Sequence, residues 1–173
     1  MTIHTTHPFA DPDPDPSRRL RGRLGGAVSL WTAGAAPAQA GLTVTSLMLA
    51  NGAPAKVLAL LDPDADLAES LLRTQRAVVH LLAWPHRDLA DAFAGVTPAP
   101  GGPFRLAEFE DTDHGPRLVS AATWALVSLE SAVEVGWSTL VTCVIDAVTI
   151  GDDDQPLMHR RGRYQSADSR VEE

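Results

Sequence analysis

Short apolar runs alternate with short polar breaks through the middle of the chain, which is the pattern of a protein built mainly from β-strands. Several runs end at a strong turn signal, such as Asn51-Gly52-Ala53-Pro54. The runs are long enough for strands, and most are too short for helices. We therefore predict strands at 25–32, 41–50, 56–61, 77–83, 104–109, 118–119 with 122–135, and 137–150.

Two segments carry helix signals instead. Asp66 and Glu69 have the spacing of a capping box, which predicts a short helix that ends at about 72–73. Pro85 can begin a second helix, and Gly95 can stop it. The inner face of that helix would hold Leu89, Ala92 and Phe93.

The segments after the second helix are dominated by turn-forming and polar residues. Residues 96–103 predict a loop dense in proline and glycine, and 110–115 predict a polar turn. The run 156–164 closes the ordered part. Strands at hairpin spacing, with a helix on either side of the fourth strand, predict a mainly β fold. The expected architecture is a closed or nearly closed antiparallel barrel with two or so short helices at its rim.

The two ends of the chain differ from the middle. Alternating Asp and Pro from Asp11 to Pro16 disfavours helix and sheet, because each proline lacks an amide donor and restricts the residue before it. We expect a disordered or extended tail at 1–20, one domain at 21–165 and a polar tail at 166–173. A short cluster of arginines lies where the chain enters the domain. We interpret it as a solvated edge of the fold, and the alternative is a surface that lies against a partner subunit. The cluster is Arg18, Arg19, Arg21 and Arg23.

Composition narrows the classes of function. The formal net charge is −8, which disfavours nucleic-acid binding because phosphate contacts need clustered Lys and Arg. No apolar run approaches the roughly 18 residues that span a bilayer, and the N-terminus lacks a secretory signal pattern. Cys143 is the only cysteine, so no disulfide within the chain is possible. These features predict a cytoplasmic protein without a membrane partner.

Most familiar catalytic motifs are absent from the sequence. It has no phosphate-binding loop and no dinucleotide fingerprint, and its six histidines lack metal-type pairing, so we predict no metal site. Cys143 lies among valines in a strand run, which favours a buried inert thiol over a nucleophile. Ser46 has no base nearby and no flanking nucleophile-elbow glycines.

The remaining features suit the binding of a flat, anionic cofactor. Thr43, Thr45 and Ser46 place three small hydroxyls on one strand, although threonine is also simply a good strand residue. His80 lies inside an otherwise apolar strand, where a packed structural role is the commoner one. The run 156–164 combines an imidazole, three arginines and a tyrosine. It is either a solvated strand end or a place for a phosphate and a ring.

Several of these stretches, taken in order, carry a family resemblance. Residues 41–46 match a Gly-x-Thr-x-Ser-Ser type segment, 88–95 match a helix, and 156–164 match a closing Pro-Leu-x-(Tyr/His)-x-x-Gly-x-Tyr signature. All three belong to the flavin reductase-like family, the FMN-binding split barrels, which the chain resembles over about 22–165. His80 stands where the family often has Asn. The resemblance implies a split β-barrel.

The same resemblance implies the site residues. Contacts to the flavin would come from the hydroxyl run, the turn after it, the fourth strand, the second helix and the C-terminal run. These residues are Thr43, Val44, Thr45, Ser46, Ala50, Asn51, Lys56, His80, Leu81, Leu82, Phe93, Arg163 and Tyr164. Among them, Asn51 and Lys56 would face the ribityl-phosphate end. His159 is the candidate catalytic residue, which would orient a nicotinamide.

The implied activity is the reduction of FMN or FAD by NADH or NADPH, in a homodimer that supplies reduced flavin to a separate monooxygenase. Trp31, Trp84 and Trp137 would lie either at the dimer surface or in the core. Two alternatives remain open. One is a flavin-binding module that transfers electrons or senses redox state without reductase turnover. The other is a dimeric scaffold that has lost flavin.

Overall fold

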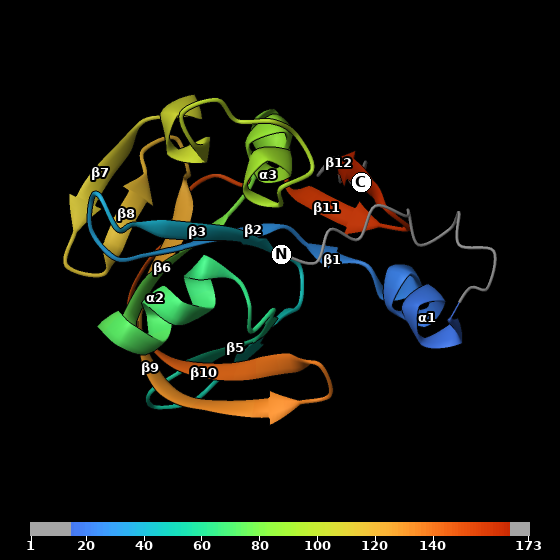
Figure 1. The fold of residues 1–173 in the computed structure, drawn as a ribbon, viewed down its shortest axis with the longest axis horizontal. Helices are drawn as coiled ribbons and strands as arrows, with labels where there is room; N and C mark the ends of the chain where they lie inside the picture. The colour runs from blue at the N-terminus through green and yellow to red at the C-terminus, as the bar shows by residue number, and fades with distance from the viewer. Residues whose placement is uncertain (1–14, 167–173) are drawn as a thin grey trace, which may run out of the picture.

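A curled antiparallel sheet of seven strands dominates the computed structural model, which describes residues 15–166 (Figure 1). Its strands are β2 (Ser29–Ala33), β3 (Ala40–Val44), β4 (Leu47–Ala50), β5 (Lys56–Leu61), β6 (Arg76–Leu81), β9 (Thr123–Val135) and β10 (Ser138–Thr149). Their order is β3-β2-β6-β9-β10-β5-β4, and neighbouring strands are antiparallel. The prediction of a mainly β, split-barrel fold with short helices is confirmed.

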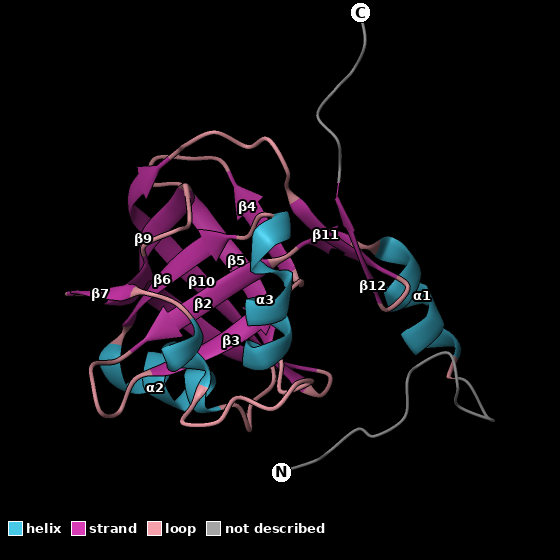
Figure 2. Cartoon of the chain, turned by 90° about the horizontal axis from the view of Figure 1, so that it is seen from above, coloured by secondary structure: helices cyan, strands magenta, loops and turns pink. Residues whose placement is uncertain are grey.

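The other elements surround this sheet (Figure 2). The helices are α1 (Pro16–Leu24), α2 (Asp66–Thr74) and α3 (Arg87–Phe93), with 3-10 turns η1 (Trp84–His86) and η2 (Pro103–Leu106). A three-stranded sheet joins β1 (Gly26–Ala27), β11 (Leu157–Arg160) and β12 (Arg163–Ser166), and β7 (Phe109–Thr112) pairs with β8 (Gly115–Leu118). Within residues 15–166, no helix is long and apolar enough to cross a membrane.

β3 and β4 follow each other in the chain but lie at opposite edges of the sheet. The sheet curls until β3 approaches β5, and Thr45 and Ser46 form the corner that bridges the two edges. The prediction of one strand at 41–50 is therefore wrong. No charge or proline marks the corner in the sequence. Beyond the corner the run is open to solvent, since Met48 and Leu49 are 65% and 62% exposed.

The inside of the curled sheet holds the main core. Trp31, Leu61, Val127 and Val141 are almost completely buried there, and α2 closes one end with its own apolar side. The capping box predicted for α2 is wrong: the residue before the helix is Ala65, which has no side-chain cap. The two acidic residues of the motif lie in the first helical turn, where negative charge is favourable.

The outside of the sheet is covered over only half of its width. α3, β8 and β11 pack against β2 and β6 and form a second core, which we call the outer core. Over β4, β5, β9 and β10 the outward side chains include apolar residues that are partly or largely exposed. The chain neighbours of Leu60 in β5 are buried, and side chains alternate along a strand, so Leu60 faces outward. In the strand register Leu140 is opposite Leu60, and Val133 is opposite Leu140. We call this surface the bare face: Met48, Leu58, Leu60, Val133 and Leu140.

The segment after α3 differs from its prediction. Residues 103–106 form η2 rather than a strand, so the strand predicted at 104–109 is wrong. The polar turn predicted at 110–115 is a hairpin of β7 and β8. Its polar side chains alternate with Phe109 and Leu118, which lie opposite each other and pack in the outer core. The apolar contacts that form this hairpin are long-range, and a local pattern does not show them.

The described part of the predicted N-terminal tail is helical. α1 begins at Pro16, and the Asp15 carboxylate accepts a hydrogen bond from the Ser17 amide at 2.9 Å. A capping aspartate followed by proline is a favourable helix start, so the extended structure expected here is wrong. None of the residues of α1 is buried in the single chain, so both a solvated edge and a surface against a partner subunit stay predictions for the arginine cluster. The tails predicted at 1–14 and 167–173 lie outside the described residues.

Candidate functional site

The hairpin of β11 and β12 holds His159 and Tyr164 against the barrel. Arg161 and Gly162 have φ angles of 54° and 73°, the geometry of a two-residue hairpin turn that matches strand twist. Leu157 is buried in the outer core, and its amide and carbonyl both make hydrogen bonds of 2.9 Å to neighbouring segments. The closing run is therefore anchored to the barrel rather than being a frayed strand end.

Three side chains connect this hairpin to α3. The Tyr164 hydroxyl donates to the Asp91 carboxylate at 2.9 Å. The Tyr164 ring lies edge-on to His159, with ring centroids 5.6 Å apart, and the two residues are opposite each other in the hairpin. Burial and the hydrogen-bonded Asp91 carboxylate raise the pKa of Tyr164, so the phenol keeps its proton and stays a donor. We call Asp91, Tyr164 and His159 the hairpin link.

The corner between β3 and β4 lies beside the hairpin link. A Cβ added to Gly26 would fall 2.9 Å from the Thr45 carbonyl oxygen, so the corner passes directly over Gly26. Gly26 is paired with His159. Thr43 donates to the Ala90 carbonyl of α3 at 2.7 Å. The fold thus brings together the hydroxyl run, α3 and the C-terminal histidine, which the sequence separates widely.

Two of the three hydroxyls of this run already donate within the protein. Thr43 donates to Ala90, and the Ser46 hydroxyl donates to the Leu60 carbonyl at 2.7 Å. The expected role of these two hydroxyls as donors to a flavin edge therefore changes. They fix the corner in place, and their oxygens remain available only as acceptors.

The free edge of β4 offers backbone donors and acceptors for a flavin ring, in place of the hydroxyls that are used within the protein. β4 is the last strand of the sheet and pairs with β5 alone, so alternate backbone N–H and C=O groups point away from the sheet. The side chains of Met48 and Leu49 are exposed beside that edge. These two side chains project from opposite faces of the strand, so each face of the edge has one apolar side chain beside the row of backbone donors and acceptors. This environment suits the edge of a flat heteroaromatic ring.

The predicted phosphate end is only weakly cationic. Ala50 and Asn51 are exposed at the end of β4 that is farther from the corner. Lys56, which is paired with Ala50, forms an ion pair with Glu130 at 2.7 Å. Its charge is therefore partly neutralised. Arg163 is exposed at the start of β12, close to the hairpin link.

His80 is a structural residue. Its side chain is completely buried, and its Nε2 accepts a hydrogen bond from the Leu118 amide at 2.9 Å. Nδ1 must then carry the proton, which it donates to the Leu30 carbonyl at 2.8 Å. Burial lowers the pKa of His80 to about 4. Both ring nitrogens are in use, so the predicted flavin contact by this side chain is wrong.

Three further predicted contacts are core residues. Val44, Leu82 and Phe93 are 3%, 3% and 4% exposed. Phe93 packs edge-on against Phe104, with centroids 4.9 Å apart, which is the contact that buries it. Their apolar side chains serve packing, so the prediction that they contact flavin is wrong for the side chains. Leu81 remains 42% exposed.

The three tryptophans considered for a dimer surface separate into different environments. Trp31 is completely buried and donates to the Ser29 hydroxyl at 3.1 Å, so the surface alternative is wrong for it. Trp84 is partly buried in the outer core, with the Arg87 guanidinium 5.1 Å from the ring centre. Trp137 is 88% exposed in the turn between β9 and β10.

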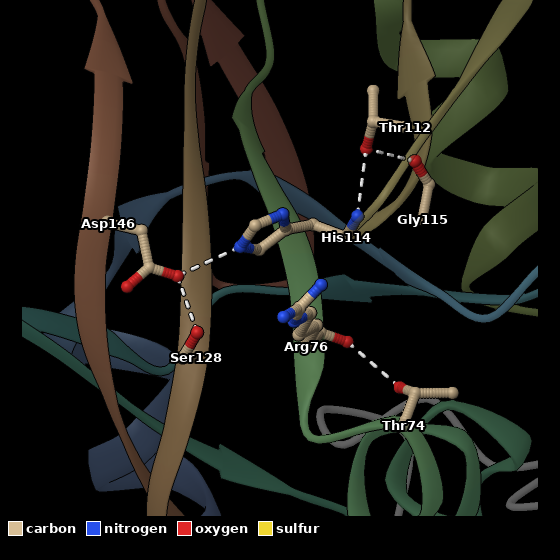
Figure 3. Close-up of polar contacts among 7 residues, drawn as sticks. All are labelled: Thr74, Arg76, Thr112, His114, Gly115, Ser128 and Asp146. Carbon is tan, nitrogen blue, oxygen red and sulfur yellow. Dashed lines mark hydrogen bonds and ion pairs between the residues drawn. The ribbon is translucent and has the colours of Figure 1, made fainter.

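A second polar cluster lies where the β7–β8 hairpin meets the sheet (Figure 3). The Asp146 carboxylate accepts hydrogen bonds from Ser128 and from His114 Nε2, the latter at 2.8 Å. Burial alone would raise the pKa of Asp146, but these hydrogen bonds lower it. Ser128 and His114 both bond the carboxylate rather than each other, so the cluster is not a serine–histidine relay. It fastens the hairpin tip to β9 and β10.

The environment of Cys143 agrees with its prediction from the sequence. Burial and nearby carboxylates raise the pKa of the Cys143 thiol to about 12, as expected for a buried inert cysteine. Among residues 15–166, no group of His, Cys, Asp and Glu side chains is arranged to hold a metal ion.

The candidate site is an open wall rather than an enclosed pocket. The hollow beside His159 has a volume of about 190 Å³ and is lined by residues of α1, β1, β11 and β12. Pockets that bury an organic ligand are typically about 300–1,000 Å³. The corner, the edge of β4 and the hairpin link together form one wall, and a ring placed against it needs another surface to cover it.

Asp91 and Gly26 are site residues that the sequence did not indicate. Asp91 lies in the predicted helix, but its bond to Tyr164 joins residues that are far apart in the chain. Gly26 is one of two adjacent glycines at the start of a predicted strand, and only the passage of the corner over it explains why a side chain is excluded.

Comparisons of sequence and of structure find similar proteins that are named as flavin reductases or flavin oxidoreductases. An FMN reductase (NADH), RutF, of Ancylobacter novellus is 26% identical over 150 residues, which cover 86% of this chain and 82% of that protein. A Streptomyces globisporus NADH:FAD oxidoreductase, SgcE6, solved with NAD and FAD fragments, has a TM-score of 0.80 at 19% identity and covers 91% and 98% of the two chains.

The styrene monooxygenase flavin reductase SMOB of Pseudomonas putida has a TM-score of 0.77 at 22% identity and covers 88% of this chain and 97% of its own. At these identities the structural similarities show the fold. The family model described as the flavin reductase like domain matches residues 21–168, and the chain therefore belongs to that family.

Proposed function

We propose that this protein is an NAD(P)H-dependent flavin reductase, which transfers a hydride from a nicotinamide nucleotide to FMN or FAD. The observation that carries this proposal is the placement of His159. The hairpin link fixes it beside the β3–β4 corner and near the open edge of the sheet. The names of the relatives, an FMN reductase (NADH) and an NADH:FAD oxidoreductase, support the same chemistry.

In this proposal the protein supplies binding and orientation, and a bound flavin supplies the redox chemistry. The backbone of β4 would hold the ring edge, with Met48 and Leu49 exposed on the two faces of that strand. His159 would orient the nicotinamide, with Tyr164 fixing the imidazole through their ring contact. Holding two rings in a reactive arrangement contributes most of the rate in reactions of this kind.

We propose that the working form is a homodimer. The small hollow beside His159 leaves a bound ring largely uncovered in a single chain. The bare face exposes contiguous apolar side chains across four strands, which is typical of a surface that contacts another protein. A second copy would cover both. A cytoplasmic location and delivery of reduced flavin to a separate monooxygenase remain predictions.

The test is an absorbance assay with the full-length protein. We expect NADH or NADPH oxidation to depend on added FMN or FAD. His159→Ala should lower the turnover, whereas His86→Ala, a histidine whose ring bonds Ser120 and the Ala83 amide, should leave it nearly unchanged. Absence of oxidation with every nucleotide and flavin pair contradicts the proposal. Flavin binding without oxidation would favour the electron-transfer or sensing module.

A further inference from the structure

Charge is distributed very unevenly in this acidic protein. We call α1 with its cap and the β11–β12 hairpin the arm (residues 15–24 and 157–166), and residues 25–156 the body. The arm carries seven arginines and one acidic residue, Asp15. The body carries 16 acidic and 6 basic side chains. A cationic surface is therefore attached to a strongly anionic body, which favours a charged contact between molecules.

The helix of the arm has little support within its own chain. No residue of α1 is buried, and Leu20 and Leu24 are 63% and 75% exposed. Its C-terminal end is held to the hairpin by the Arg161 amide, which donates to the Gly22 carbonyl at 2.8 Å. An isolated helix of nine residues is marginal in water, because most helical stability in proteins comes from packing. α1 therefore lacks a packing surface.

The position of the arm suggests where that surface comes from. In Figure 1, α1 extends to the right of the barrel, and the turn between β9 and β10 also points to the right. Trp137, which is 88% exposed, lies in that turn, next to the strands of the bare face. The arm and the tip of the β9–β10 hairpin therefore lie at the same end of the molecule.

We propose that the arm docks on the acidic body of a second copy of this chain, so that α1 of each subunit packs against its partner. This deepens the homodimer proposed above and rests on it. The bare face provides the apolar part of the contact, and the arm provides its charged part. A two-fold arrangement makes both docking contacts at once, because each subunit offers the same arm and the same body.

A second copy matches the arm better than a nucleic acid does. The net charge of the whole chain is −8, so a polyanion is repelled by the body while it is attracted by the arm. For the body of a second copy, the two charges are complementary. Attraction between exposed charges is screened within about 10 Å at 0.1 M salt, so this contact must weaken as salt is added.

The experiment measures the dimer dissociation constant of the full-length protein by sedimentation, from about 0.05 M to about 1 M NaCl. One variant reverses three exposed charges of α1: Arg18→Glu, Arg19→Glu and Arg21→Glu. A matched control reverses three arginines of the body and so changes the net charge equally: Arg73→Glu, Arg76→Glu and Arg105→Glu. Circular dichroism and flavin titration report whether each variant stays folded.

We expect the α1 variant to raise the dissociation constant about tenfold or more at low salt, with no weakening in the control. The wild-type constant should rise with salt and approach that of the α1 variant. A dimer that responds neither to salt nor to the α1 variant overturns the role of the arm while leaving the homodimer intact. A monomer under all conditions overturns both. If the dimer is weakened equally in the α1 variant and in the control, the effect comes from net charge, and the proposed role of the arm is overturned. Arginine-dependent retention on heparin by a monomer would assign the arm to polyanions instead.

Discussion

Replacement of His80 tests whether this residue braces the fold as its contacts indicate. In His80→Leu, the Leu118 amide and the Leu30 carbonyl lose their partners inside the core. Each buried polar group without a partner costs about 1–3 kcal/mol, so we expect a loss of about 2–6 kcal/mol in the free energy of unfolding. This is a large share of the roughly 5–15 kcal/mol typical of a domain.

The same residue should make stability depend on pH. The pKa of His80 is about 4 in the folded chain, against 6.5 for the ordinary side chain. The unfolded chain therefore takes up a proton first as the pH falls, and the folded state loses relative stability. The contribution is complete above pH 6.5 and is lost as the pH falls toward about 4. Between pH 7 and pH 4.5 it should amount to about 2–3 kcal/mol.

Urea unfolding followed by tryptophan fluorescence at the two pH values measures both effects. His80→Gln is the matched control for contacts, since its amide offers one donor and one acceptor but does not titrate. We expect the glutamine variant to recover part of the stability lost in His80→Leu and to lose less stability than wild type on acidification. A wild-type pH dependence that persists unchanged in both variants would refute the assignment of this effect to His80.

Three further changes address the candidate site and the core. Tyr164→Phe removes the hydrogen bond to α3 and should raise KM for the nicotinamide nucleotide about 3- to 30-fold in steady-state assays, whereas Asp88→Asn, on the same helix but exposed, should not. Gly26→Ala places a Cβ against the Thr45 carbonyl and should cost about 1–3 kcal/mol in urea unfolding; an unchanged midpoint would contradict the close passage of the corner. Cys143 should resist iodoacetamide at pH 8 until urea unfolds the protein, and rapid labelling of the native chain would contradict its burial.

The strands and helices that local pattern could predict are those with strong local signals. The strand at 56–61 matches its prediction because a short, continuous apolar run is bounded by turns on both sides. The helix after Pro85 stops near Gly95, whose φ of 71° explains why glycine is needed there. In contrast, α1 was hidden by its aspartate–proline context, although Asp15 and Pro16 together are also a favourable helix start.

The candidate site was predictable only in part, because its residues meet through long-range contacts. The hydroxyl run and His159 were recognised as separate features, and strand register places them side by side at Gly26. His80 illustrates the opposite case. Its position in an apolar strand fitted either a ligand contact or a packed residue, and only the two backbone partners decide between them. Nothing local in the sequence identifies those partners.

The two edge strands of the curled sheet differ in whether another element covers them. This difference indicates where a ligand or a partner chain would bind. The edge strand β3 is covered by α3 through the bond from Thr43 to Ala90. The edge strand β4 exposes Met48 and Leu49. Proteins usually protect an edge by charge, proline or a covering element, because unpaired strand groups attract other chains. β4 itself contains neither charge nor proline, so a bound ring or a second subunit has to provide the cover that β3 receives from α3.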